Sequence, residues 1–250
     1  MSGHSKWASI KHKKAATDSK RGQMFNKLIR EITVAARMGG GDPDTNARLR
    51  LVMQKAKEIN MPTDNVTRAI KRGTGELEGV SYEESSYEGY GPNGTAVLID
   101  VLTDNKNRTT SEIRMIFSKN SGNLGSNGCV AWMFAKKGLV SVKNENIKED
   151  DLFNIVVDAG AEDLMLDSEL NIYEITCEPE NLEKVKKALS DKKIPVESSE
   201  LSKIPKSYIK IAEEGKARQM ARLISELEGH DDVQNVYTNA DIPDSAFEGV

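Results

Sequence analysis

Two series of strand and helix patterns, one lying inside the other along the chain, most restrict how this sequence can fold. Residues 138–200 give a complete series of strand, helix, two strands, helix and strand, which is the order of a ferredoxin-like domain. The residues on either side, 94–134 and 207–239, give the same order only when they are joined. The sequence therefore predicts two ferredoxin-like α/β domains, one inserted in the other.

Three amphipathic helical patterns come before the strands and predict a small bundle. The first ends at the glycine run that follows Met38, the second restarts at Asp42-Pro43 and stops at Pro62, and the third ends at Gly73. Residues 74–93 are read as a boundary and a loop. The fold class is α+β, and the predicted divisions are a basic arm (1–19), the helical bundle (20–75), a discontinuous domain (76–134 and 205–250) and an inserted domain (135–204).

Charge is unevenly distributed along the chain. The net charge is −4, but residues 1–75 contain 16 basic and 6 acidic residues, whereas residues 76–250 contain 19 basic and 33 acidic ones. The first third of the chain therefore attracts polyanions and the remainder repels them.

The basic arm and the first helix carry the predicted binding site. Apolar residues recur along one side of this helix, and lysine and arginine gather on the other side as a cationic stripe. Trp7 has little in a polar arm to pack against, and it can stack on a base or dock on the bundle. A solvated tail is the plain alternative. The predicted nucleic-acid contacts are Lys6, Trp7, Lys11, His12, Lys13, Lys14, Lys20, Arg21, Lys27, Arg30 and Arg37.

A second, weaker anion or RNA contact is predicted at the start of the helix that follows the strand at 95–102. Free backbone N–H groups there, with Lys106 and Arg108, can hold an anion, although Asp104 acting as a helix cap is the plain reading. We expect the glycine-rich loop 122–128 to lie nearby. The residues of this second site are Asn105, Lys106, Arg108 and Asn123.

Signs of catalysis, metal binding and membrane insertion are weak. No serine lies in a G-x-S-x-G turn, His230 has no evident nucleophile, and Asp231-Asp232 reads as a turn before the last strand. Cys129 and Cys177 lack partners at metal-ligand spacing. The N-terminus has no apolar core of a signal peptide, and no run approaches transmembrane length. We expect a cytoplasmic protein that is not an enzyme, with no metal, no cofactor, no small-molecule substrate and no membrane contact.

Several segments resemble the YebC family. They begin with Gly3-His4-Ser5-Lys6-Trp7 and Lys27-Leu28-Ile29-Arg30-Glu31-Ile32, continue through Thr103-Asp104-Asn105-Lys106-Asn107-Arg108-Thr109, and end with Asp231-Asp232-Val233-Gln234-Asn235-Val236. The likeness covers nearly the whole chain, and Cys129 departs from it at a position where serine is expected. The resemblance implies a regulator of gene expression, since some members are regarded as transcription regulators that bind duplex DNA and others act in translation on ribosomes.

The resulting hypothesis is a non-enzymatic, nucleic-acid-binding regulator, favoured as an RNA- or ribosome-binding translation factor. One bundle offers no paired recognition helices for a palindromic operator, whereas an arm with one stacking aromatic suits folded RNA. A DNA-binding transcriptional regulator is the first alternative, and an acidic protein–protein scaffold is the alternative of another class. The partner is then rRNA, the ribosome or duplex DNA, and no oligomer is evident.

Overall fold

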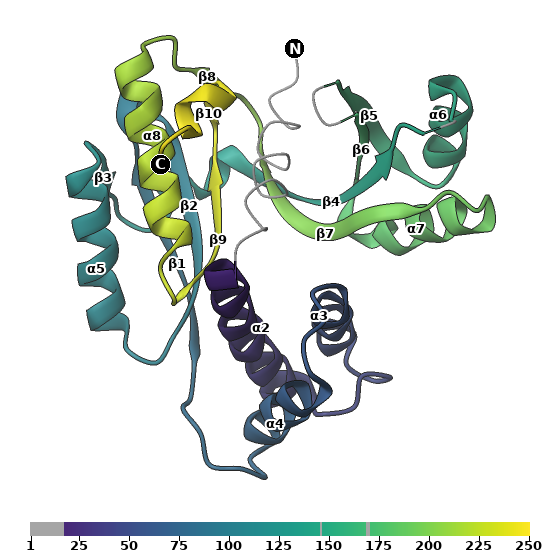
Figure 1. The fold of residues 1–250 in the computed structure, drawn as a ribbon, viewed down its shortest axis with the longest axis horizontal. Coiled ribbons are helices and arrows are strands. Elements are labelled where there is room, and N and C mark those ends of the chain that lie inside the picture. Colours follow the sequence, from purple (N-terminus) through teal and green to yellow (C-terminus); the bar gives the residue numbers. More distant parts are fainter. Residues whose placement is uncertain (1–17, 146, 169–170) are drawn as a thin grey trace. The chain divides into compact units, whose positions relative to one another are not determined.

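The computed structural model describes residues 18–145, 147–168 and 171–250, and these divide into two compact units (Figure 1). One unit contains residues 132–210. The other contains residues 18–131 and 211–250. The expected α+β architecture, a three-helix bundle followed by two α/β sheet domains, is confirmed.

The bundle consists of α2 (Asp18–Gly39), α3 (Ala47–Glu58) and α4 (Thr63–Thr74). Each helix turns one apolar face inward, as the 3.6-residue period of the sequence predicts. The buried core of the bundle contains Ile32, Ala35, Leu49, Val52, Ala56, Met61, Val66 and Ala69.

Asn46 fixes the connection between α2 and α3. Its Oδ1 accepts a hydrogen bond from the Leu49 N–H at 3.0 Å, and its Nδ2 donates to the carbonyls of Ala35 and Gly40, both at 2.8 Å. The buried amide therefore caps α3 and also holds the end of α2. The predicted restart of the helix at Asp42-Pro43 is wrong, because α3 begins four residues after Pro43.

Glycine explains how closely α4 packs on α2. A Cβ atom at Gly73 would lie 2.4 Å from the Thr33 carbonyl oxygen, so no larger residue fits there without movement of the backbone. Gly73 is inside α4 rather than at its end. The helix is terminated by Gly75, whose φ of +84° lies in the left-handed region that glycine adopts readily.

The discontinuous domain contains a four-stranded antiparallel sheet in the order β3-β1-β2-β9. Helices α5 and α8 lie side by side on one face of it (Figure 1). Segments far apart along the chain meet here, because Val97 of β2 pairs with Thr238 of β9. The elements are β1 (Glu83–Tyr90), β2 (Ala96–Thr103), α5 (Lys106–Lys119), β3 (Asn123–Leu124), α8 (Glu214–Glu228) and β9 (Val233–Thr238), with the short strand β10 (Ala240–Asp241). The short strand β8 (Ile209–Lys210) is at the end of the other unit.

Two details of this sheet differ from the sequence prediction. Residues 83–90, expected to be a loop, form β1 and pair along their full length with β2. Residues 130–134, expected to be a strand, instead contain a short 3-10 turn at Ala131–Met133. The sheet therefore begins with a hairpin rather than with the strand-helix-strand series predicted. The sequence of β1 is polar, and its partner strand supplies the backbone hydrogen bonds that make it a strand.

The inserted unit has the predicted ferredoxin-like series. Its antiparallel sheet has the order β5-β6-β4-β7, and α6 and α7 pack on one face through a buried apolar core. The elements are β4 (Phe134–Lys143), α6 (Glu149–Asp158), β5 (Ala161–Asp167), β6 (Ile172–Cys177), α7 (Leu182–Asp191) and β7 (Val196–Pro205).

In the part of the chain that is described, none of the helices is both long enough and apolar enough to cross a membrane.

Candidate nucleic-acid interface

Most of the arm prediction falls outside the described residues. This holds for Lys6, Trp7, Lys11, His12, Lys13 and Lys14, and for the side chains of Lys20 and Arg21. The structure therefore shows the surroundings of three of the predicted contacts: Lys27, Arg30 and Arg37.

These three α2 cations each contact the discontinuous domain, and Arg37 is exposed to solvent as well. The Lys27 ammonium donates to the Glu228 carbonyl at 2.6 Å. The Arg37 guanidinium donates to the Ser81 hydroxyl and the Tyr82 carbonyl. These side chains join the bundle to the domain that follows it, and contact of the stripe with a polyanion stays a prediction.

Arg30 makes the most extensive of these contacts. Its Nη1 donates to the Asp231 carbonyl at 2.8 Å and to the Leu102 carbonyl at 3.3 Å, and it forms an ion pair with the Asp232 carboxylate. Its guanidinium carbon lies 5.3 Å from the centre of the Tyr82 ring, within the range of a cation–π contact. The Arg30 side chain is 17% exposed, so this pair is largely shielded from solvent.

Asp232 is the centre of this cluster. Its Oδ2 accepts hydrogen bonds from the Thr109 hydroxyl at 2.6 Å, from Arg108 Nη2 at 2.8 Å and from the Thr103 hydroxyl at 3.0 Å. Arg30 pairs with Oδ1 and Arg108 with Oδ2, so both carboxylate oxygens have a charged partner. Asp232 is 2% exposed, and its charge is matched by two guanidinium groups and two hydroxyls.

The protonation of Asp232 follows from a balance of opposing effects. Burial of the carboxylate favours its neutral form, but the hydrogen bonds from Thr109, Arg108, Arg30 and Thr103 outweigh burial and hold the Asp232 pKa well below its usual range. Asp232 is therefore ionised at every physiological pH.

Three distant segments meet at this carboxylate. Arg30 comes from the middle of α2, Thr103 from the end of β2 with Arg108 and Thr109 from the first turn of α5, and Asp232 from the turn before β9. The Asp232 carbonyl also accepts a bond from the Leu102 N–H at 2.9 Å, which extends the pairing of β2 with β9. Sequence reasoning assigned Asp232 to a plain turn, since nothing in the local pattern indicates a partner 202 positions away.

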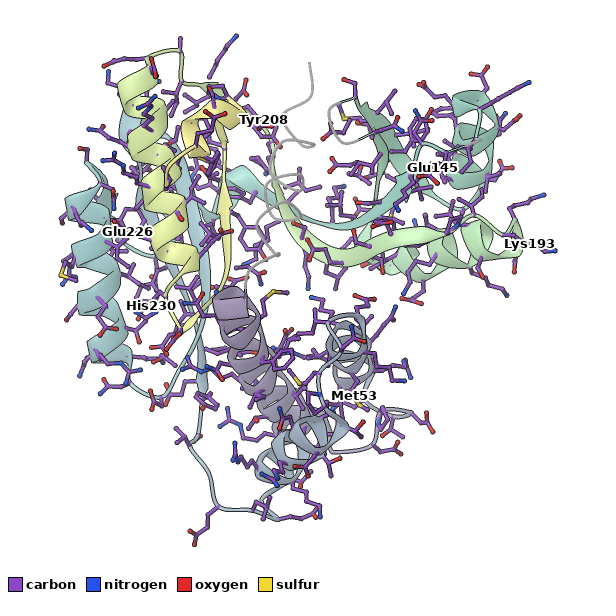
Figure 2. The ribbon with its side chains drawn as sticks, in the orientation of Figure 1. Met53, Glu145, Lys193, Tyr208, Glu226 and His230 are labelled. Carbon is purple, nitrogen blue, oxygen red and sulfur yellow. The ribbon has the colours of Figure 1, made fainter. Side chains whose placement is uncertain are left out.

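His230 lies beside the cluster, just past the C-terminal end of α8 (Figure 2). Its Nδ1 accepts a hydrogen bond from the Asp232 N–H at 3.1 Å, so the proton of the neutral ring is on Nε2, which contacts Glu112 Oε2 at 2.8 Å. Ligand atoms of Glu112, His230 and Asp232 lie within 4.8 Å of one another. Because both ring nitrogens and both Asp232 oxygens are engaged and two guanidinium groups adjoin them, the cluster is poorly suited to hold a metal cation.

The predicted second site at the start of α5 is built as an internal network. Asn105 caps α5 by accepting from the Arg108 N–H at 3.1 Å, so Asn105 and not Asp104 is the cap. The Lys106 ammonium pairs with Glu83 at 2.8 Å, and Arg108 pairs with Asp104 and Asp232. The cationic groups that would bind an anion here are thus already paired with carboxylates of this chain.

The glycine-rich loop 122–128 does not adjoin that network. It follows the C-terminal end of α5, a helix of 14 residues. At 1.5 Å per residue the two ends are about 20 Å apart. Asn123 is exposed in β3, where its backbone pairs with Tyr90. The expectation that Asn123 and Asn105 share one site is therefore wrong.

Glu88 of β1 organises the chain that follows this loop. Its carboxylate accepts hydrogen bonds from the backbone N–H groups of Gly128 at 2.6 Å and of Val130 and Ala131 at 2.7 Å. Glu88 is 6% exposed, and these donors replace the water that it loses. Sequence reasoning missed this role, because a glutamate in a polar stretch gives no sign that it will be buried.

Comparisons with known proteins agree along the whole chain. A sequence model described as "TACO1/YebC protein N-terminal domain" matches residues 5–76, and one described as "TACO1/YebC second and third domain" matches residues 82–240. A "Probable transcriptional regulatory protein" of Natranaerobius thermophilus is 55% identical over 99% of both chains. One of Persephonella marina is 53% identical over the full length of both.

A solved structure is also similar. The crystal structure of the conserved hypothetical protein Aq1575 from Aquifex aeolicus superposes with a TM-score of 0.85 at 45% sequence identity, and covers 95% of this chain and 97% of its own. Its fold is the three-helix bundle followed by two α/β sheet domains described above.

Proposed function

Because this chain belongs to the TACO1/YebC family, we propose that it is a non-enzymatic, nucleic-acid-binding regulator of gene expression. Curated relatives at 50–55% identity are named probable transcriptional regulatory proteins. The observation that carries the proposal is the separation of charge, with 16 basic and 6 acidic residues in positions 1–75 and an acidic remainder. Such a protein approaches a polyanion with its N-terminal third foremost.

We favour RNA, on or near the ribosome in the cytoplasm, as the target. The arm combines four lysines with Trp7. The aromatic ring can stack on an unpaired base while the lysines attract the neighbouring phosphates. The names of the relatives favour the alternative, a regulator that binds duplex DNA. The two differ in the nucleic acid preferred, not in the part of the chain that meets it.

A binding experiment with three ligands tests the proposal. Purified full-length protein is titrated with ribosomes, with a structured rRNA fragment and with a DNA duplex over a series of salt concentrations. The logarithm of affinity should fall linearly with the logarithm of salt, with a slope of about −0.9 per phosphate contact on duplex DNA and about −0.7 on single strands. Tighter binding to rRNA and ribosomes supports the RNA target, and tighter binding to the duplex supports the alternative.

Two variants of the arm sharpen this test. Deletion of residues 1–17 should weaken nucleic-acid binding sharply, because four lysines and Trp7 are removed. Trp7→Ala alone should cost about 1–3 kcal/mol on RNA if its ring stacks on a base. Absence of binding to all three ligands at low salt would contradict the proposal and favour an acidic protein–protein scaffold instead.

A further inference from the structure

Helix α4 has a solvent-exposed face that carries several cations. Asp64, Thr67, Arg68, Lys71 and Arg72 are all exposed, and their spacing of three and four residues places them on one side of the helix. The opposite side carries Val66 and Ala69, which are buried in the bundle core. Three of the five exposed side chains are cationic and one is acidic.

The cations of this face have little compensation within the protein. Arg68 pairs with Asp64 at 2.9 Å, but these side chains are 63% and 66% exposed, so the pair is weak and easily exchanged for another anion. Lys71 and Arg72 have no carboxylate partner within 4 Å among the described residues. In α3, one of the four cations, Arg48, pairs with Glu84.

The helix that carries these cations is held rigidly. Gly73 brings the last turn of α4 against the backbone of α2, where a Cβ atom would lie 2.4 Å from the Thr33 carbonyl. The Thr33 hydroxyl contacts the Ala69 carbonyl at 3.3 Å as well. The outer cations are therefore presented at fixed spacing on a packed element. Lys71 and Arg72 also lie in the last turn of α4, where a positive charge interacts favourably with the helix dipole. Both side chains are exposed to solvent.

We infer that the outer face of α4, formed by Thr67, Arg68, Lys71 and Arg72, is a phosphate-contact surface for the sugar–phosphate backbone of a nucleic acid. The inference rests on the proposed function and adds a site to it, since Lys27, Arg30 and Arg37 of α2 each contact the following domain, whereas Lys71 and Arg72 of α4 have no ion-pair partner among the described residues. The face contains no aromatic side chain to stack on a base, so it contributes affinity and orientation without reading sequence. Base contacts are left to other parts of the protein.

A pair of charge-matched variants tests this inference. In the α4 variant, Arg68, Lys71 and Arg72 are each replaced by Gln, which retains helix propensity and hydrogen-bonding capacity. In the control variant, the exposed lysines Lys184, Lys187 and Lys192 of the inserted unit are each replaced by Gln. Both variants have three fewer positive charges, so a difference between them reports position and not net charge. The probes are a structured rRNA fragment and a DNA duplex, each titrated over a salt series, and thermal melting verifies the fold.

The α4 variant should bind at least roughly tenfold more weakly at low salt, whereas the control variant should stay near the wild-type protein. The salt slope of the α4 variant should be shallower by about 0.7–0.9 for each phosphate that the protein no longer neutralises. If the α4 variant is destabilised, Lys71→Gln and Arg72→Gln are measured singly, and each should reduce the slope by the amount expected for one phosphate.

Two outcomes would overturn the inference, and they differ in what they imply for the proposed function. Wild-type binding by both triple variants, together with weak binding after deletion of residues 1–17, would overturn the inference and leave the proposed function standing. No binding by the wild-type protein to either probe would overturn both.

Discussion

Asp232 in the discontinuous domain and Glu174 in the inserted unit are buried to the same extent but have opposite surroundings. Each is 2% exposed. Asp232 accepts hydrogen bonds from two arginines and two threonines. Glu174 lies in β6 opposite Ser141 of β4, on the sheet face away from α6 and α7. Within the described chain neither of its carboxyl oxygens has a hydrogen-bond partner, and neither does the Ser141 hydroxyl.

The two carboxyl groups respond to burial in different ways: one stays ionised and the other takes up a proton. Asp232 remains charged because its donors replace water. Burial raises the pKa of Glu174 to about 7, and the negative charge of Asp167, a neighbour on the adjacent strand, adds to the effect. Glu174 is therefore substantially protonated near neutral pH. Burial alone thus does not determine the charge of a carboxyl group; the donors around it do.

The largest expected effect is that of removing the Asp232 carboxylate. Asp232→Ala leaves the two guanidinium groups of Arg30 and Arg108 without their shared anion and should lower the free energy of unfolding by about 3–5 kcal/mol. Chemical denaturation at neutral pH measures this. The neighbouring Asp231→Ala, which removes an exposed carboxylate, should change it by about 0.5 kcal/mol or less. Similar effects of both variants would show that the turn, and not the Asp232 carboxylate, provides the stability.

Glu174 should make stability depend on pH in the opposite sense from a paired acid. Its pKa is about 7 in the folded protein and near 4.5 when unfolded, so the folded state holds the proton more tightly. The contribution of Glu174 to the free energy of unfolding is fully present below pH 4.5 and is lost as the pH rises to about 7. The total loss is about 3 kcal/mol.

Glu174→Gln cannot ionise and tests this directly. Its stability should match that of the wild-type protein near pH 4.5 and exceed it above pH 7, as measured by denaturation at a series of pH values. Glu180→Gln, at an exposed site in the same unit, serves as the control. Equal pH profiles for the wild-type protein and Glu174→Gln would contradict the assigned protonation.

Removal of Arg30 should have a smaller effect than removal of Asp232. In Arg30→Gln the carboxylate keeps Arg108, Thr103 and Thr109, so the free energy of unfolding should fall by about 1–2 kcal/mol. Combining Arg30→Gln with Asp232→Ala should cost less than the sum of the two single changes, because the residues interact directly. Additive effects in this double-mutant cycle would show that the pair is energetically uncoupled.

The smallest expected effect is at Ser141. Ser141→Ala removes a buried hydroxyl that has no hydrogen-bond partner among the described residues, so stability should stay level or rise by up to about 1 kcal/mol. A thermal melt suffices to measure this. A clear decrease in stability would indicate that the hydroxyl is bonded in solution, for example to the protonated Glu174.

The sequence predicted elements whose pattern is local and strong. The helix expected at 149–159 is α6, the helix expected at 215–227 is α8, and the strand expected at 233–238 is β9. In these segments the apolar residues recur at the period of the structure that buries them. The strand at Glu83–Tyr90 was missed, because its Glu, Ser and Gly residues match neither period and its order comes from pairing with β2.

The candidate interface shows the same division more sharply. The sequence by itself determined that α2 has one apolar and one cationic side, since a helical repeat fixes which residues share a face. Only the tertiary structure decided that Lys27, Arg30 and Arg37 contact the following domain and that Lys71 and Arg72 of α4 have no ion-pair partner among the described residues. The physical reason is that a helical repeat fixes which residues share a face but not which distant segment packs against that face. The partner of Arg30 is a carboxylate 202 positions away, brought near by the pairing of β2 with β9.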